Sequence, residues 1–253
     1  MAKAERAAIV TGGASGIGLA TVERLIGDGW HVGALDRDEA ALARLRDRHG
    51  DTVRVGALDV TDEGAADHVI AEMAQAFGRL DGLVNSAGIG LDKPALETSV
   101  AEFRKVLDIN VTGTFITARA AGRIMKEQGS GAIVNIASIA GMRGSKGRVA
   151  YGASKGAVAI MTQVMAVDLA RYGIRVNAVA PGPVDTPLVQ QVHTPQVRRA
   201  YAHHTPMRRY GTPDEIASAI CFLLDGSQSG YVTGAILPVD GGFAGAGMME
   251  IEV

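Results

Sequence analysis

Hydrophobic residues fall into short runs rich in β-branched side chains, and longer stretches with helical periodicity separate these runs. Residues 133–136, Ile-Val-Asn-Ile, are apolar almost throughout, which is typical of a parallel strand covered on both faces. The pattern predicts strands over residues 7–11, 31–36, 52–58, 80–86, 132–137, 174–180 and 235–239. It predicts helical regions over residues 17–28, 39–48, 63–77, 100–128, 149–171 and 213–224.

This alternation of strands and helices is typical of a parallel sheet with right-handed crossovers. No linker, internal repeat or low-complexity tract interrupts the 253 residues. We therefore expect an α/β fold over residues 1–253: a single doubly wound Rossmann-type domain, with a parallel sheet of about seven strands and helices on both faces.

Residues 186–211 depart from the pattern and form a long connection between the sixth strand and the last helix. They include three prolines, three histidines and four arginines. Long connections at the carboxyl edge of such a sheet commonly close over a ligand, so this segment is predicted to be a substrate lid. A polar surface helix flanked by turns is the alternative.

Composition narrows the possible partners. The formal charge of −2 gives no electrostatic reason to expect nucleic acid or an anionic membrane. The single cysteine, Cys221, lies in an apolar run and indicates a reducing compartment. No apolar run approaches the ~20 residues that span a bilayer, and residues 1–5 lead directly into a strand without a signal peptide. We expect a cytoplasmic protein with a small-molecule substrate and no bound metal.

A glycine-rich turn follows the first predicted strand. Residues 11–18 read Thr-Gly-Gly-Ala-Ser-Gly-Ile-Gly and open the first helix. Glycines allow the backbone to approach a pyrophosphate, and the helix N-terminus offers free N–H donors. A purely structural turn is the alternative, but the position inside a strand–helix–strand unit favours a dinucleotide site. The residues expected to bind it are Gly12, Ser15, Gly16, Ile17 and Gly18.

Acidic residues at the ends of the second and third strands indicate which dinucleotide binds. A carboxylate at Asp36 can accept hydrogen bonds from both ribose hydroxyls and would repel a 2′-phosphate, which favours NAD over NADP. Arg37 is a complication, because a guanidinium there could pair with that phosphate. Asp59 and Val60 are expected to meet the adenine ring. The alternative for Asp59 is a helix N-cap, a role that Asp62 could fill equally well.

Tyr151 and Lys155 are four residues apart in a predicted helix, so their side chains lie on one face, one turn apart. A free phenol titrates near ~10, and a neighbouring ammonium favours its ionised form. The pair is therefore a candidate proton-transfer device. Taken alone the spacing is weak, since Tyr and Lys occur four residues apart on many surface helices by chance.

Together with Asn-Ser-Ala-Gly at residues 85–88, these motifs make the chain resemble a short-chain dehydrogenase/reductase over about residues 6–243. Asn110, Ser138, Pro181-Gly182 and Asp240-Gly241-Gly242 also match. Ser86 is a small departure, because the family more often has a second Asn there.

The resemblance implies that Tyr151 is the acid or base, that Lys155 lowers its pKa and bonds the nicotinamide ribose, and that Ser138 orients the substrate oxygen. It implies that Asn110 holds a water molecule in a proton relay. It also implies hydride transfer to or from nicotinamide and a homotetramer in which two long helices pack across one interface. The further cofactor-binding residues that it implies are Asn85, Ala87, Gly88, Pro181, Gly182, Val184 and Thr186.

The substrate is not specified by these motifs. The loop before Tyr151 is unusually basic, and Arg148 could contact an anionic or polar substrate such as a polyol, a sugar acid or a hydroxy acid. The alternative is that these cations face solvent or pair with carboxylates at a subunit interface. The expected function is an NAD-dependent oxidoreductase that interconverts a secondary alcohol and a ketone. A 3-oxoacyl reductase-like ketone reductase and a non-catalytic nucleotide-sensing regulator are the alternatives.

Overall fold

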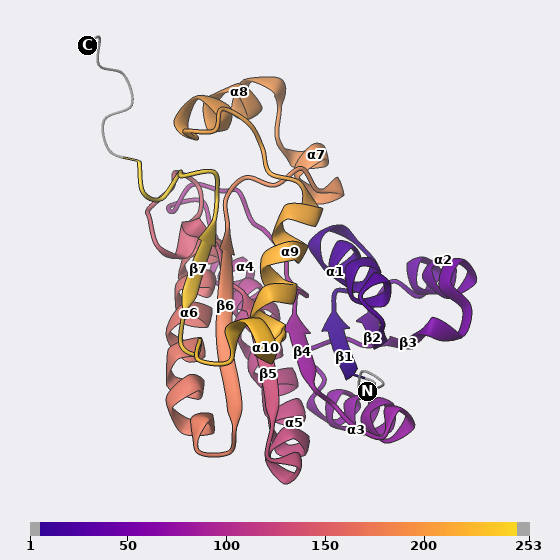
Figure 1. Ribbon diagram of the computed structural model, residues 1–253. Helices are drawn as coiled ribbons and strands as arrows, with labels where there is room; N and C mark the ends of the chain where they lie inside the picture. Colours follow the sequence, from indigo (N-terminus) through magenta and orange to yellow (C-terminus); the bar gives the residue numbers. More distant parts are fainter. Residues whose placement is uncertain (1–5, 247–253) are drawn as a thin grey trace.

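The computed structural model describes residues 6–246, so the expectation about residues 1–5 lies outside the described chain. A seven-stranded parallel sheet runs through its centre in the order β3-β2-β1-β4-β5-β6-β7 (Figure 1). This confirms the predicted fold class. The strands are β1 (Arg6–Thr11), β2 (Trp30–Asp36), β3 (Val53–Ala57), β4 (Gly82–Asn85), β5 (Gly131–Ile136), β6 (Ile174–Pro181) and β7 (Ile236–Val239).

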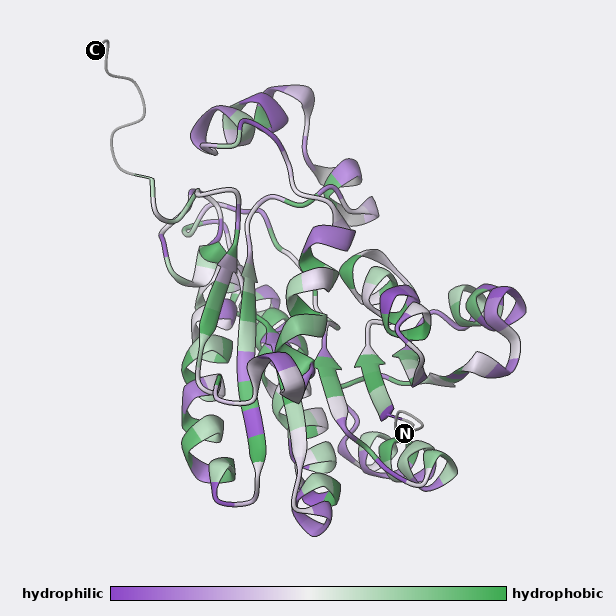
Figure 2. Ribbon diagram, viewed as in Figure 1, coloured by the Kyte–Doolittle hydropathy of each residue, from purple (hydrophilic) through white to green (hydrophobic). Residues whose placement is uncertain are grey.

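Helices cover both faces of this sheet. The longer ones are α1 (Gly16–Gly27), α2 (Glu39–His49), α3 (Glu63–Phe77), α4 (Val100–Leu107), α5 (Gly113–Gln128), α6 (Val149–Ala170), α8 (Pro195–His204) and α9 (Pro213–Leu224). One hydrophobic core lies between the sheet and α1, α2 and α9, and a second lies between the sheet and α3, α5 and α6. Hydropathy follows these layers, with apolar strands inside and polar stripes on the outer sides of the helices (Figure 2).

The strand order reverses between β1 and β4, as in other doubly wound sheets. β1 pairs with β2 on one side and with β4 on the other, all in parallel. A ligand crevice forms outside the carboxyl ends of the strands at such a reversal. The predicted glycine turn follows β1 directly, so the topology brings it to this crevice.

The helical region predicted over residues 100–128 is helical throughout but divided into three pieces. A single π-helical turn, Asp108–Thr112, separates α4 from α5. Such turns insert an extra residue into the helix and are frequent at functional sites. Here the turn places Asn110 in the interior, where it is fully buried.

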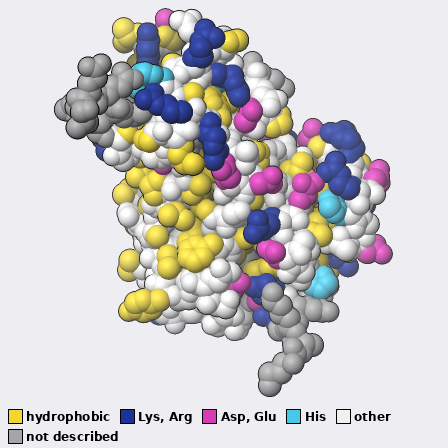
Figure 3. All heavy atoms as spheres, turned by 45° about the horizontal axis from the view of Figure 1, so that its top comes forward, with side chains coloured by type: hydrophobic (Ala, Val, Ile, Leu, Met, Phe, Trp, Pro, Cys, Tyr) yellow, Lys and Arg dark blue, Asp and Glu magenta, His cyan; other side chains and the backbone are white. Residues whose placement is uncertain are grey.

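Residues 186–211 contain two short helices, α7 (Pro187–Val192) and α8 (Pro195–His204), which project from the carboxyl edge of the sheet (Figure 1). Each begins with a threonine cap followed by proline: Thr186 accepts from the Val189 N–H, and Thr194 accepts from the Val197 N–H. We call residues 187–204 the α7–α8 segment. Basic side chains gather over the part of the surface formed by this segment and the residues that follow it (Figure 3). The arginines of these residues are Arg198, Arg199, Arg208 and Arg209.

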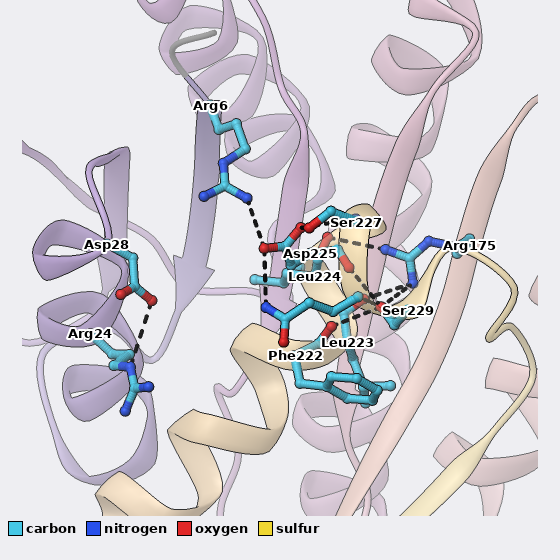
Figure 4. A network of polar contacts seen from close by, with 11 residues as sticks. Arg6, Arg24, Asp28, Arg175, Phe222, Leu223, Leu224, Asp225, Ser227 and Ser229 are labelled. Atoms are coloured by element: carbon cyan, nitrogen blue, oxygen red, sulfur yellow. Dashed lines mark hydrogen bonds and ion pairs between the residues drawn. The ribbon is translucent and has the colours of Figure 1, made fainter. Parts of the chain in front are cut away.

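Arg175 on β6 anchors the end of α9 to the sheet. Its Nη1 donates to the Leu223 carbonyl at 2.7 Å, and its Nη2 donates to the Leu224 carbonyl at 3.0 Å (Figure 4). These carbonyls belong to the last turn of α9, where no further helical N–H is available. Asp225 then begins the short helix α10 (Gly226–Ser229) and pairs with Arg6 at 3.3 Å. The network lies at the opposite end of α9 from the crevice.

In the part of the chain that the structure describes, no helix has the length and apolar character needed to cross a membrane.

Candidate active site

The glycine turn is shaped for a close approach of backbone to ligand. Gly12 has a φ of 64°, and a Cβ there would lie 2.8 Å from the Ala87 nitrogen. A Cβ on Gly18 would lie 2.0 Å from the Gly12 carbonyl oxygen, so any side chain at either position would force the turn open. Within the described chain, the Ser15 side chain makes no capping hydrogen bond to α1. The first turn of α1 therefore keeps N–H donors for an anion, which fits the pyrophosphate of a dinucleotide.

Asp36 lies beside this turn at the carboxyl end of β2. Its Oδ2 accepts a hydrogen bond of 3.1 Å from the Ala14 N–H, and its Oδ1 accepts one of 3.1 Å from the Asp38 N–H. The carboxylate therefore stabilises the glycine turn through its bond to Ala14, and it lies where the ribose is expected to bind. Arg37 is exposed.

At the end of β3, the two aspartates have different roles. Asp62 caps α3 by accepting from the Ala65 N–H at 2.9 Å, so Asp59 is not this cap. Asp59 instead accepts from the N–H and hydroxyl of Thr61, and the backbone bond is the main cause that holds its pKa below the usual value. Val60 is buried against Gly113 at the start of α5.

Asn85 belongs to a buried polar network under the crevice. Its Nδ2 donates to Asn135 Oδ1 at 2.9 Å, and its Oδ1 accepts from the Thr117 hydroxyl at 2.7 Å. Asn135 Nδ2 in turn donates to the Thr162 hydroxyl at 2.9 Å. The network joins β4 and β5 to α5 and α6. The Asn85 side chain therefore has a structural role, and only its backbone and the following turn can face the crevice.

Asn110 connects that turn to α6. Its Oδ1 accepts from the Ile89 N–H at 2.8 Å, while its Nδ2 donates to the Ile89 carbonyl and to the Ser154 hydroxyl, each at 3.0 Å. A Cβ on Gly88 would lie 3.1 Å from Asn110 Oδ1 and 3.6 Å from Lys155 Nζ. The side chain of Asn110 thus positions the loop after β4 next to Lys155. The water relay stays a prediction.

Ser138, Tyr151 and Lys155 meet at the carboxyl end of β5. Ser138 is buried, and its hydroxyl accepts from the Ala140 N–H at 3.1 Å. It lies near enough to the half-buried Tyr151 to lower the pKa of that phenol. Lys155 is also buried, and its Nζ donates to the Ile136 carbonyl at 2.7 Å. The same Nζ lies 5.8 Å from the centre of the Tyr151 ring. The structure therefore brings together the three side chains that the sequence singled out.

Burial and neighbouring charge shift the pKa of Tyr151 in opposite directions. Burial raises the pKa of Tyr151 above its usual value, and the nearby Ser138 hydroxyl and the charge of Arg148 oppose this rise in part. Arg148 is thus one cation that lowers this pKa, and the same effect of Lys155, whose Nζ lies 5.8 Å from the ring centre, stays a prediction. Burial lowers the pKa of Lys155 to about 8. A proton can therefore be moved at the phenol more easily than in a fully apolar pocket.

The remaining predicted cofactor residues follow β6. The Gly182 N–H donates to the Val239 carbonyl at 3.1 Å, and a Cβ on Gly182 would lie 2.7 Å from the Asp240 Cα. Pro181 and Val184 are buried. The Thr186 methyl lies 3.6 Å from the position that a Cβ on Gly16 would occupy, so this segment lies beside the glycine turn.

Arg148 is near Tyr151 but is already paired. Its guanidinium lies 5.4 Å from the centre of the Tyr151 ring, and its Nε lies 2.6 Å from Asp92 Oδ1. Its Nη2 lies 3.2 Å from His193 Nε2 on the α7–α8 segment. Arg148 thus pairs with a carboxylate of its own chain, whereas the expected alternative was a pair across a subunit interface. Asp92 was missed in the sequence, where a lone aspartate in a loop carries no signal.

Comparison with known proteins gives a consistent result. Residues 12–244 match the family model described as enoyl-(acyl carrier protein) reductase. The chain is 44% identical to the cis-4-hydroxycyclohexanecarboxylate dehydrogenase of Sinomonas cyclohexanicum, over 95% of this chain and 97% of that protein. It is 43% identical to the L-tagatose-forming galactitol 2-dehydrogenase of Cereibacter sphaeroides, over 93% of this chain and 94% of that protein.

The fold is also similar to solved structures. The structure of ElxO with NADP bound superposes with a TM-score of 0.89 at 33% identity, over 96% of this chain and 100% of that chain. The sequence match, the fold and the Ser138–Tyr151–Lys155 geometry agree with one another. The chain belongs to the short-chain dehydrogenase/reductase family and is an oxidoreductase of the secondary-alcohol type.

Proposed function

We propose that the protein interconverts a small polar secondary alcohol and its ketone with NAD, with Tyr151 as the acid or base. The observation that carries this proposal is the meeting of Ser138, Tyr151 and Lys155 beside the glycine turn. The nicotinamide, when bound, supplies the hydride acceptor or donor. Ser138 and Tyr151 would hold the substrate oxygen, and the phenol would exchange the proton with it.

The preference for NAD rests on Asp36. Its carboxylate lies at the end of β2, bonded to the glycine turn, where a 2′-phosphate would meet like charge. ElxO, a structural relative, has NADP bound, so this fold can also hold the phosphorylated dinucleotide. Arg37 is the side chain that could reverse the preference, because it is exposed next to Asp36 and could pair with a phosphate.

A small polar substrate is supported by the relatives. Galactitol is an uncharged polyol, whereas 4-hydroxycyclohexanecarboxylate carries a carboxylate, and enzymes for both are more than 40% identical to this chain. The surroundings of Tyr151 include further polar and aromatic groups, namely Arg148, Tyr201 and His193. This setting suits a hydroxylated substrate better than a long apolar chain.

We also propose a homo-oligomer, as the family resemblance implies. α6 carries an exposed apolar stripe at helical spacing, formed by Ile160, Val164 and Val167, which are 62%, 54% and 79% exposed. A second copy would cover this stripe. Light scattering of the wild-type protein and of Val167→Glu tests it: a tetramer that falls apart in the variant supports the proposal, and a wild-type monomer refutes it.

The function is tested by absorbance at the reduced-nicotinamide band. Galactitol, cyclohexanol and cis-4-hydroxycyclohexanecarboxylate are offered with NAD and with NADP, side by side. Turnover of at least one alcohol, faster with NAD, is expected. Absence of turnover with every alcohol and with the matching ketones, while NAD still binds, would favour a nucleotide-sensing protein instead.

A further inference from the structure

Arg148, beside Tyr151, contacts two segments that are far apart in the sequence. Asp92 comes from the loop after β4, and His193 from the junction of α7 and α8. Both contact the same guanidinium, at 2.6 Å and 3.2 Å. The backbone supports the first contact, because the Lys93 N–H donates to the Gly147 carbonyl at 2.9 Å. Arg148 is therefore the side chain through which the α7–α8 segment is joined to the loop beside the catalytic tyrosine.

His193 is built into the α7–α8 segment. It is 8% exposed, its ring stacks on Tyr201 with centroids 5.1 Å apart, and its Nδ1 lies 3.0 Å from the Tyr210 hydroxyl. Tyr210 is held in turn by Arg198, whose guanidinium lies 4.4 Å from the centre of its ring. Because Arg148 can only donate, the Nε2 atom that faces it must be an acceptor, which requires a neutral imidazole.

We propose that Arg148 is a positioning residue that latches the α7–α8 segment over the active site through Asp92 and His193, and that it does not bind a substrate anion. Its charge is paired with Asp92 and its Nη2 is occupied by His193. The side chain is only 16% exposed. The wall that it forms beside Tyr151 is therefore close to neutral. This part of the proposal rests on the proposed function and assigns the site an uncharged alcohol or ketone.

The latch should weaken in acid. The groups that face His193 are Arg148 from the start of α6, Asp92 from the loop after β4, and Arg198 and Tyr201 from α8, with Tyr210 beyond them. Burial is the main cause that lowers the pKa of His193, and the charge of Arg148 adds to it, while Asp92 opposes both. A group whose pKa is lowered in the latched state stabilises that state above its usual pKa, and the stabilisation is lost as the pH falls.

Hydrogen–deuterium exchange of residues 187–204 in the cofactor-free protein tests the latch without using activity. Asp92→Asn and Arg148→Met should each speed exchange by about tenfold to a hundredfold, the effect of losing a charge-assisted contact. The double variant should be no faster than the faster single variant, since both changes break one link. Asp67→Asn, which breaks an Arg123 pair of 3.2 Å on the α3–α5 surface, is the matched control and should change nothing there.

The pH dependence provides a second exchange measurement. Each exchange rate is divided by the intrinsic chemical exchange rate at the same pH. The corrected rate for residues 187–204 of the wild-type protein should rise as the pH falls below about 6.5. His193→Gln should abolish this dependence. If the Arg148→Met protein does not fold, the same measurement is made on Arg148→Lys. The lysine ammonium cannot contact Asp92 and His193 together as the guanidinium does. Unchanged protection in Asp92→Asn and in the Arg148 variant, or effects that add in the double variant, would overturn the proposal.

Kinetics separate the latch from an anion site. A latch predicts that Arg148→Met raises KM for cyclohexanol and for cis-4-hydroxycyclohexanecarboxylate by similar factors. An anion site predicts a rise of about tenfold or more for the carboxylate alone, with Asp92→Asn lowering that KM because it frees the guanidinium. The latter result would refute the proposal. If wild-type protein turns over neither alcohol nor any other, the proposed function fails, while the exchange result still decides the latch.

Discussion

The Nζ atom of Lys155 donates a 2.7 Å hydrogen bond to the carbonyl of Ile136, the last residue of β5, while it lies 5.8 Å from the centre of the Tyr151 ring. The strand end thus fixes the ammonium below the phenol. Burial lowers the pKa of this lysine to about 8, so near neutral pH it still carries its charge in a buried position. An ammonium so placed stabilises a phenolate when one forms.

Lys155→Met should slow turnover and weaken cofactor binding, because one ammonium is predicted to serve both the phenol and the nicotinamide ribose. The acidic limb of the pH profile for alcohol oxidation should move upward, since the phenol then lacks the ammonium that is predicted to favour its ionised form. Initial rates from pH 6 to 10 check this. Lys126→Met on α5 is the control, and an active Lys155 variant with an unmoved profile would contradict the role.

Asp36→Ala should erode the preference for NAD by removing both the ribose acceptor and the charge that repels a 2′-phosphate. It also removes the hydrogen bond that Asp36 accepts from the Ala14 N–H, and this loss alone would weaken binding of both dinucleotides. Asp36→Asn separates the two effects, because the amide oxygen can still accept from Ala14. The ratio of kcat/KM for NAD to that for NADP should fall in both variants. A wild-type preference for NADP would refute the assignment.

Asn135→Leu should destabilise the fold while leaving the cofactor site nearly intact. It removes the acceptor of Asn85 Nδ2, which is left with a long contact of 3.4 Å to the Thr114 carbonyl. A buried amide deprived of its partner costs about 1–3 kcal/mol of unfolding free energy. Urea unfolding measures the loss, with the exposed Thr52→Val as control. A stable Asn135 variant with much weaker NAD binding would instead place this network in the binding site.

The sheet and its helices could be predicted because each buried strand is a short apolar run and the stretches between the strands have helical length and periodicity. Ser138, Tyr151 and Lys155 could be identified because a family motif fixes their spacing. The α7–α8 segment also contains local signals in its sequence for where its two helices begin. Threonine followed by proline at residues 186–187 and 194–195 is a helix-start pattern, and both helices begin there.

Other features could not be read from sequence. The π-helical turn at Asp108–Thr112 continues a helical pattern without a break, so only the fold reveals that Asn110 turns inward. The pairing of Arg148 with Asp92 and His193 depends on three loops that converge in space, and no spacing rule relates them. The sequence therefore identified Arg148 as important but left its partner open.

Tyr151→Phe tests the central claim most directly, because it removes only the proton that the phenol exchanges with the substrate oxygen and little packing volume. Turnover of the best alcohol with NAD should fall by about 10² to 10⁴, the usual effect of a positioned acid–base group, with NAD affinity nearly unchanged. Tyr172→Phe, just beyond the far end of α6, should behave as wild type. A Tyr151 variant that keeps more than about a tenth of the wild-type rate would contradict the assignment of this residue as the acid or base.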